Sequence, residues 1–256
     1  MYRGNRISVV IPCHNEEEGI RAVLAQMPAL VDEVLVVDNA STDRTAAVAR
    51  ELGARVVFER RKGYGRAYKT GFAAARGDII VTMDGDGTYP PDSLPLLLYV
   101  LVEEKLDFIT ARRWYSSSGQ AKSPIRLLGN AILSGAMMCL FFKFIIDSQS
   151  GMWVFRREVL RKIAPRSDSM ALSEELKILA FTHPQLRCLE MPIYYGERIG
   201  TSKLNIWRDG FGNLFFLLRM RLVLGRRRRA AVVTPLPLPD EGAEAAVARA
   251  PAKGTS

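Results

Sequence analysis

The sequence predicts an α/β fold, in which a mostly parallel sheet is flanked by helices. In the first half of the chain, short apolar runs rich in β-branched residues alternate with longer stretches that have helical spacing. The short runs are apolar at nearly every position, which is typical of parallel strands that helices cover on both faces. The 256 residues, of which 48% are hydrophobic, also suffice for a large core. In such a fold ligands bind beyond the carboxyl ends of the strands.

Five strands and four helices are expected in the first 110 residues. Each apolar run ends at a polar or small residue, and a helical stretch follows after a short loop. The predicted strands are residues 7–11, 33–37, 55–58, 78–83 and 106–110, and the predicted helices are residues 16–30, 41–52, 64–75 and 91–104. Ser41, Thr42 and Asp43 form a cluster of N-cap residues at the start of the second helix.

The second half of the chain carries two apolar segments beside basic residues. Residues 127–146 are strongly apolar but include Lys143, and a spanning, a buried and an interfacial helix all remain open for them. Residues 211–225 run into four arginines at 226–229, which is typical of an amphipathic helix at an anionic membrane surface and is also compatible with packing on the core. We expect one globular domain over 1–204 that includes an interfacial helix near 126–146, an amphipathic, basic membrane-associated segment over 205–229, and a disordered tail over 230–256.

The positive charge is concentrated in the same part of the chain. The formal net charge is +9, and residues 197–229 alone contribute +7. Such a surplus suits nucleic acid, a membrane surface or a phosphorylated substrate. Three cysteines without a CxxC pair argue against a disulfide scaffold and a zinc ribbon, and the polar N-terminal residues argue against a secreted product.

Asp84 and Asp86 are the leading candidates for chemistry. They lie one residue apart, directly after the fourth predicted strand, and are flanked by Gly85 and Gly87. Two carboxylates at a strand end can hold Mg²⁺ or Mn²⁺ while the metal keeps phosphate oxygens among its ligands. Capping of the turn is the structural alternative.

Other strand ends add polar residues and glycines to the same edge. Residues 12–16 (PCHNE) follow the first strand, and Asp38 follows the second, where it can accept hydrogen bonds from a base or ribose. Residues 62–65 (KGYG) follow the third strand, and their glycines permit close approach of the backbone to a ligand. They do not complete the GxGxxG pattern of a dinucleotide site, and the sequence has no GxxxxGK[ST] P-loop.

Four segments resemble the GT-A glycosyltransferases of family 2 in order and spacing: VIPCHNEEEGI, VVDNASTDRT, RKGYGRAYKTGF and MDGDGTYPP. From about residue 7 to residue 204 the chain is similar to the polyprenyl-phosphate sugar synthases, which include dolichyl-phosphate mannose and glucose synthases. The resemblance implies the GT-A fold and a hexosyltransferase that uses a nucleotide-sugar donor. It implies that Asp84 and Asp86 hold the metal and that Asp86 is catalytic. The implied donor-binding residues are Pro12, His14, Glu16, Asp38, Gly65, Asp84 and Gly85.

Three later segments imply a phosphate acceptor. Thr110-Ala111-Arg112, Arg126 and RIGTSK at 198–203 resemble the segments by which the family grips a lipid monophosphate. A phosphate is already an anion at pH 7 and needs cations that desolvate and aim it, rather than a base. The implied phosphate ligands are Arg112, Arg126, Arg198 and Lys203, with Arg126 also catalytic. Direct displacement by the phosphate would invert the anomeric centre.

Asp147 leaves a second acceptor class open. It lies in DSQSG, which resembles a family segment where relatives with hydroxyl acceptors keep a base. It is expected to be catalytic, either by orienting sugar hydroxyls or Arg126, or as the base for a sugar hydroxyl or a small soluble acceptor. Capping of a turn is again the structural alternative. Glu174 and Glu175 are expected to be exposed on a helix.

The sequence therefore predicts a hexosyltransferase that acts on polyprenyl phosphate at the cytoplasmic face of a membrane, attached peripherally or monotopically. DGDGTY at residues 84–89 resembles members that use UDP-sugars, so a UDP-hexose is favoured and GDP-mannose remains open. Mg²⁺ or Mn²⁺ is the expected cofactor. The basic residues then serve a phosphate and a lipid surface, and nucleic acid is not expected as a partner.

Overall fold

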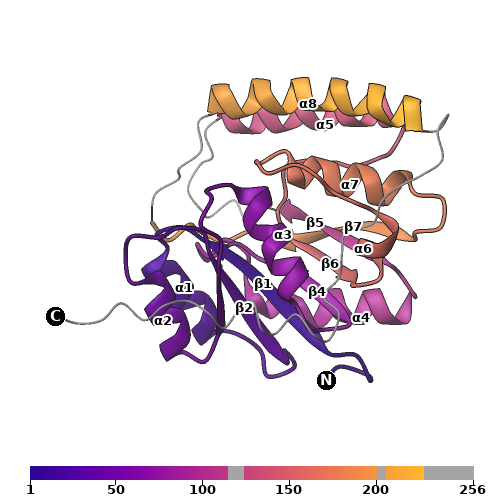
Figure 1. Ribbon diagram of the computed structural model, residues 1–256. Coiled ribbons are helices and arrows are strands. Elements are labelled where there is room, and N and C mark those ends of the chain that lie inside the picture. The colour runs from indigo at the N-terminus through magenta and orange to yellow at the C-terminus, as the bar shows by residue number, and fades with distance from the viewer. Residues whose placement is uncertain (115–123, 201–205, 228–256) are drawn as a thin grey trace.

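The computed structural model describes residues 1–114, 124–200 and 206–227, and it shows an α/β architecture built on one seven-stranded sheet (Figure 1). The strands are β1 (Ile7–Cys13), β2 (Glu33–Asp38), β3 (Arg55–Phe58), β4 (Ile79–Thr82), β5 (Phe108–Trp114), β6 (Trp153–Arg156) and β7 (Cys188–Tyr194). Their order is β3-β2-β1-β4-β6-β5-β7, and of the described strands only β6 is antiparallel to its neighbours. The predicted mostly parallel sheet is therefore confirmed.

The five predicted strands and four predicted helices are all present, and all but β3 have shifted bounds. The helices are α1 (Glu17–Ala25), α2 (Thr45–Glu51), α3 (Tyr64–Ala74), α4 (Leu94–Glu103), α5 (Pro124–Phe141), α6 (Val159–Lys162), α7 (Leu172–Thr182) and α8 (Ile206–Arg227), with a 3₁₀ turn η1 (Pro91–Ser93) before α4. α1 stops well before residue 30, because Pro28 cannot continue a helix. α2 starts at Thr45 and not at residue 41. At this start the Asp43 carboxylate accepts a hydrogen bond from the Thr45 amide at 2.9 Å.

Apolar side chains pack against both faces of the sheet. On β1, Val10 joins the core cluster formed with α3, α5, α7 and α8. Its neighbours Val9 and Ile11 join the cluster formed with α1, α2 and α4. Burial on both faces explains why the strands are apolar at successive positions and do not alternate.

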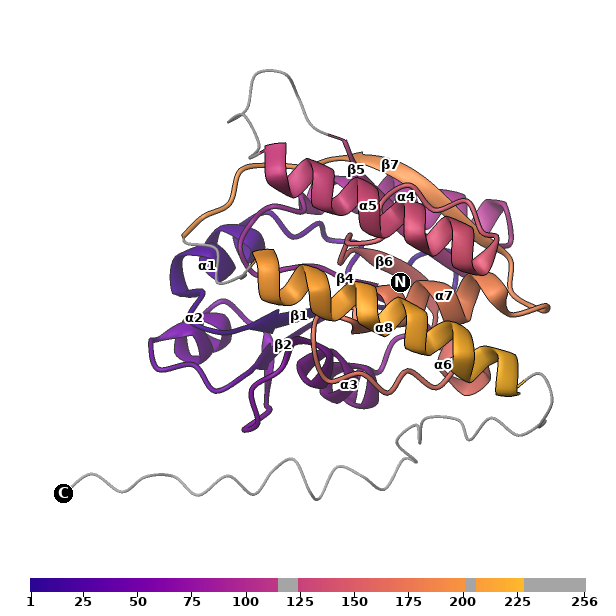
Figure 2. The same cartoon turned by 90° about the horizontal axis from the view of Figure 1, so that it is seen from above.

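α5 and α8 lie side by side on the outer side of α7 (Figures 1 and 2). Leu133 and Met137 of α5 and Leu217 and Met220 of α8 are buried in the core. The two helices expose large apolar side chains: Leu127, Leu128, Ile132, Phe211, Phe215, Leu218 and Leu222. None of the described helices is long and apolar enough to cross a membrane, and the spanning alternative for residues 127–146 is not found. The predicted tail over 230–256 lies outside the described residues.

Candidate active site

A cavity of about 810 Å³ opens beyond the carboxyl ends of β1 and β4, where the topology of the sheet predicts a ligand site. Its volume lies within the range of about 300–1,000 Å³ that is usual for small-molecule and cofactor sites. Residues after β1 and β4 form its base, and the loop before α7 forms one side. α8 closes the other side with Gly212, Asn213, Phe215, Phe216 and Arg219.

Most of the predicted donor-binding residues face this cavity. The lining includes Pro12, His14, Glu16, Asp84 and Gly85, together with Asp86. Two predicted residues are not among the lining residues.

Asp38 is one of them, since it is buried at 4% exposure and its Oδ1 accepts a hydrogen bond from the Ser41 amide at 3.1 Å. Asn39, which the sequence did not single out, lines the cavity in its place. Gly65 is the other, and a Cβ there would collide with the Ser167 carbonyl and approach the Leu172 Cβ to 2.9 Å. The glycine thus serves packing of α3 against the loop before α7.

Asp84 and Asp86 lie together at the base of the cavity. Burial raises the pKa of Asp84 to about 7, and the negative charge of Asp86 is the second cause of this rise. Asp86 is 2% exposed, and its Oδ1 accepts hydrogen bonds from Thr88 N at 3.0 Å and Thr88 Oγ1 at 2.6 Å. Its Oδ2 lies 2.5 Å from Nη2 of Arg198.

The two carboxylates fit a divalent cation. Two buried like charges side by side are stabilised by a cation between them. The described residues contain no group of three or more His, Cys, Asp or Glu side chains that could hold a metal ion. The remaining ligands would then be water or substrate phosphate, which is how Mg²⁺ is commonly bound in phosphate-handling sites.

A glycine beside Asp84 lets the Tyr64 hydroxyl pack close to the backbone. A Cβ at Gly151 would collide with the Tyr64 hydroxyl and would come within 3.5 Å of the Asp84 carboxylate. The backbone of Gly151 is held in place, since its amide donates to the Tyr89 hydroxyl at 2.8 Å and its carbonyl accepts from Thr82 Oγ1 at 2.8 Å. The loop that ends at Gly151 therefore positions one side of the carboxylate pair.

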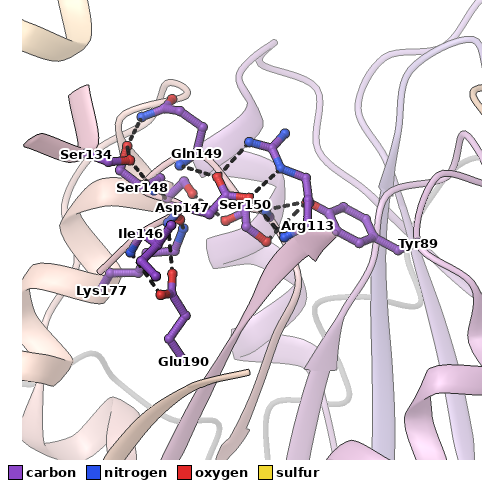
Figure 3. A network of polar contacts seen from close by, with 12 residues as sticks. Tyr89, Arg113, Ser134, Ile146, Asp147, Ser148, Gln149, Ser150, Lys177 and Glu190 are labelled. Carbon is purple, nitrogen blue, oxygen red and sulfur yellow. Dashed lines mark hydrogen bonds and ion pairs between the residues drawn. The ribbon is translucent and has the colours of Figure 1, made fainter. Parts of the chain in front are cut away.

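Asp147, at the other end of that loop, is the centre of a buried polar network (Figure 3). Arg113 binds its carboxylate through two of its three side-chain nitrogens, with Nε to Oδ2 at 2.7 Å and Nη2 to Oδ1 at 2.7 Å. Lys177 donates to the carbonyl oxygens of Asp147 and Ser148 at 2.8 and 2.9 Å. Glu190 accepts hydrogen bonds from the amides of Ile146 and Asp147 at 2.8 and 2.9 Å.

This network favours a positioning role for Asp147. Burial alone would raise the pKa of Asp147, but the charge and hydrogen bonds of Arg113 outweigh it and hold the pKa at about 2. A carboxylate so weakly basic, with both oxygens bound by one guanidinium, is a poor proton acceptor. The structure pairs it with Arg113. The side chain of Arg126, the predicted partner, lies outside what the structure describes.

The expectation that Glu174 and Glu175 are exposed is wrong. Glu174 is 0% and Glu175 5% exposed, because α7 lies between the sheet and the pair α5 and α8 (Figure 1). Glu175 caps the preceding loop, accepting from the amides at 166 and 167 at 2.9 and 2.7 Å. Glu174 Oε1 accepts from Gln149 Nε2 at 2.6 Å, and Gln149 Oε1 accepts from Asn213 Nδ2 at 2.9 Å. A polar chain therefore joins α8 at the cavity to the Asp147 loop.

Glu174→Gln is expected to stabilise the protein at about pH 9 and to leave it nearly unchanged at about pH 5. Burial raises the pKa of Glu174 from 4.5 to about 8, and its Oε2 has no hydrogen-bond partner. The stability that the protonated group contributes is therefore present at low pH and lost as the pH rises through about 8. Urea unfolding at both pH values measures the difference. The same difference at both values would contradict the prediction, and exposed Glu104→Gln is the control.

The structure places only part of the predicted acceptor set. Arg198 lines the cavity. Arg112 is half-buried on β5, with its guanidinium 5.8 Å from the centre of the Trp114 ring, and it is not among the lining residues. Lys203 lies outside the described residues. Arg219 lines the cavity although the sequence assigned the basic segment that contains it to lipid, and its place on the inner side of α8 could not be read from charge alone.

A comparison with known families assigns the chain. Residues 8–164 match the family model described as glycosyl transferase family 2. The chain belongs to glycosyltransferase family 2. A dolichyl-phosphate hexose transferase of Haloferax volcanii is 33% identical over 215 residues, which cover 82% of this chain and 91% of that protein. A dolichol-phosphate mannosyltransferase of Pyrococcus furiosus is 28% identical over 212 residues, which cover 78% of this chain and 59% of that protein.

Solved structures support the same fold. Glucosyl-3-phosphoglycerate synthase from Mycobacterium tuberculosis, in complex with Mn²⁺, UDP and phosphoglyceric acid, matches with a TM-score of 0.67 and 25% identity over 93% of this chain and 81% of that one. The same enzyme is also known in complex with Mg²⁺ and UDP. The predicted similarity to polyprenyl-phosphate sugar transferases of family 2 is confirmed by the relatives, and the chain is a hexosyltransferase.

Proposed function

We propose that the protein transfers a hexose from a nucleotide diphosphate sugar, preferably a UDP-sugar, to the phosphate of a polyprenyl or dolichyl monophosphate, with inversion at the anomeric carbon. One observation carries the proposal: a single cavity holds the Asp84 and Asp86 pair at its base and the guanidinium groups of Arg198 and Arg219 on its walls. Anionic and cationic groups in one cavity suit a reaction between a metal-bound diphosphate and a free phosphate.

The donor is proposed to bind at the base of the cavity. Pro12, His14 and Glu16 offer backbone and polar groups to the nucleotide after β1. Asp84 and Asp86 would hold Mg²⁺ or Mn²⁺ beside the diphosphate, and the bound metal supplies positive charge for the departing nucleoside diphosphate. UDP complexes of the mycobacterial relative support this donor class, and GDP-mannose stays as the second candidate.

The acceptor is proposed to enter from the side of α8. Arg198 and Arg219 would aim the phosphate at the anomeric carbon, and Phe215 and Phe216 line the cavity on the same side. The exposed apolar faces of α5 and α8 support attachment to the cytoplasmic face of a membrane, with Arg221 of α8 exposed beside them. The haloarchaeal dolichyl-phosphate hexose transferase and the Pyrococcus dolichol-phosphate mannosyltransferase support the lipid phosphate class.

A small soluble acceptor is the second candidate. It is favoured by the fold similarity to the glucosyl-3-phosphoglycerate synthase, whose structure contains phosphoglyceric acid. It would need a proton acceptor if sugar passes to a hydroxyl. The ion pair between Arg113 and Asp147 argues against Asp147 in that role.

A transfer assay with matched acceptors tests the proposal. Labelled UDP-glucose, UDP-N-acetylglucosamine or GDP-mannose is offered with Mn²⁺ to vesicles that contain a polyprenyl phosphate, to vesicles with the corresponding polyprenol, and to soluble 3-phosphoglycerate. We expect labelled lipid from the polyprenyl phosphate only. Transfer to 3-phosphoglycerate alone, or no transfer to polyprenyl phosphate from any donor, would overturn the proposal.

A further inference from the structure

Arg198 connects the two halves of the cavity. Its Nη2 lies 2.5 Å from Oδ2 of Asp86, whose side chain is 3% exposed. The other oxygen of Asp86 is already bound by the amide and hydroxyl of Thr88. A divalent ion at Oδ2 would compete with the guanidinium for this oxygen, because two positive charges so close together repel each other strongly in a buried site.

The backbone around Arg198 is fixed on the loop that carries the two aspartates. The amide of Ile199 donates to the Asp86 carbonyl at 2.8 Å, and the amide of Gly196 donates to the Thr88 carbonyl at 2.8 Å. The side chain of Ile199 lies against Gly87, where a Cβ would meet it at 3.2 Å. The Arg198 side chain is 30% exposed and borders the cavity, so it has room to change its position while the backbone stays in place.

We propose that Arg198 is an exchangeable counter-ion: its guanidinium neutralises Asp86 until a divalent ion and the donor diphosphate bind, and it then turns into the cavity to bind the phosphate of the acceptor. The second half of this statement rests on the proposed function. Binding of metal and donor thereby creates the acceptor site, which orders the two substrates. Arg198 therefore weakens metal binding in the free enzyme and strengthens phosphate binding in the loaded one. The coupling between metal binding and phosphate binding is reciprocal.

The first experiment measures Mn²⁺ affinity by calorimetry, without substrate, on the full chain. Arg198→Ala and Arg198→Gln are expected to bind Mn²⁺ about tenfold tighter than the wild type, because the competing cation is gone. Arg219→Ala is the matched control, since it removes the same charge from the wall of the same cavity without a contact to Asp86 in the described structure. Equal affinity of the Arg198 and Arg219 variants, or weaker binding by both Arg198 variants, would overturn the inference.

The second experiment measures binding of a short alkyl monophosphate and of inorganic phosphate, with and without Mn²⁺ and UDP. Mn²⁺ and UDP are expected to tighten binding of the alkyl phosphate about tenfold in the wild type and not in Arg198→Ala. If the wild type shows no such coupling while the Arg198 variants still bind Mn²⁺ more tightly, Arg198 remains the counter-ion of Asp86, and its role in phosphate binding is overturned. Coupling without transfer to polyprenyl phosphate would count against the proposed function and leave the exchange of Arg198 intact.

Discussion

Asp84→Asn is expected to lower kcat by about a thousandfold or more and to leave the protein folded, since loss of metal charge on the leaving group costs several kcal/mol of barrier. Asp84 lies at the base of the cavity, and burial together with Asp86 raises its pKa to about 7. At about pH 8 the ionised carboxylate therefore strains the folded state, so removal of its charge is not expected to lower stability. Asparagine keeps the shape but is a poorer ligand for a hard cation.

Steady-state kinetics over a range of Mg²⁺ and Mn²⁺ concentrations, with thermal unfolding of the same samples, measure both parts of this expectation. Asp92→Asn is the control, because Asp92 is an exposed carboxylate on η1 outside the cavity. Activity of Asp84→Asn within about tenfold of the wild type would remove Asp84 from the metal site. A large fall in its melting temperature would mean that the lost activity reports unfolding.

The parts of the fold that the sequence predicts are those with a strong apolar signal. β1, β2 and β4 are buried on both faces or nearly so, β3 and β5 only in part, and each appears as an apolar run. β6 was not predicted, because its four residues lie beyond the regular alternation of apolar runs and helical stretches in the first half of the chain. β7 was not predicted either, because it pairs only with β5 at the edge of the described sheet and is largely accessible, with Pro192 in its middle.

The site shows the same limit at the level of single side chains. Asp84 and Asp86 could be located because strand ends meet at one edge of a parallel sheet. Arg113 could not, since two adjacent arginines on a strand face opposite sides and the sequence does not say which side is inside. The motif favoured Arg112, whereas the structure turns Arg113 toward Asp147. Glu174 was misplaced for a related reason, because a helix packed on two sides is buried all round.

Arg113→Ala is expected to destabilise the protein by about 3–5 kcal/mol at neutral pH, since it leaves the buried Asp147 without a counter-charge. At this chain length that corresponds to a fall in melting temperature of roughly 6–20 °C. In the variant, burial raises the pKa of Asp147 above its unfolded value. The stability that the protonated carboxyl contributes is therefore present at low pH and lost as pH rises. The loss should therefore be smaller at about pH 5 than at about pH 8. Arg112→Ala, at the next position on β5, is the control and should change stability by at most about 0.5 kcal/mol.

A double-mutant cycle decides between positioning and base catalysis by Asp147. If Asp147 only positions the loop to Gly151 through Arg113, then Asp147→Asn in the Arg113→Ala background should cost little further activity, because the shared contact is already lost. It should also recover part of the stability, since the uncompensated buried charge disappears. If Asp147 is a base, Asp147→Asn should abolish turnover in both backgrounds and leave donor binding intact. Transfer rates and UDP affinity for the wild type, the two single variants and the double variant separate these outcomes. Additive loss of activity would favour the hypothesis of a hydroxyl acceptor, against which the ion pair argues.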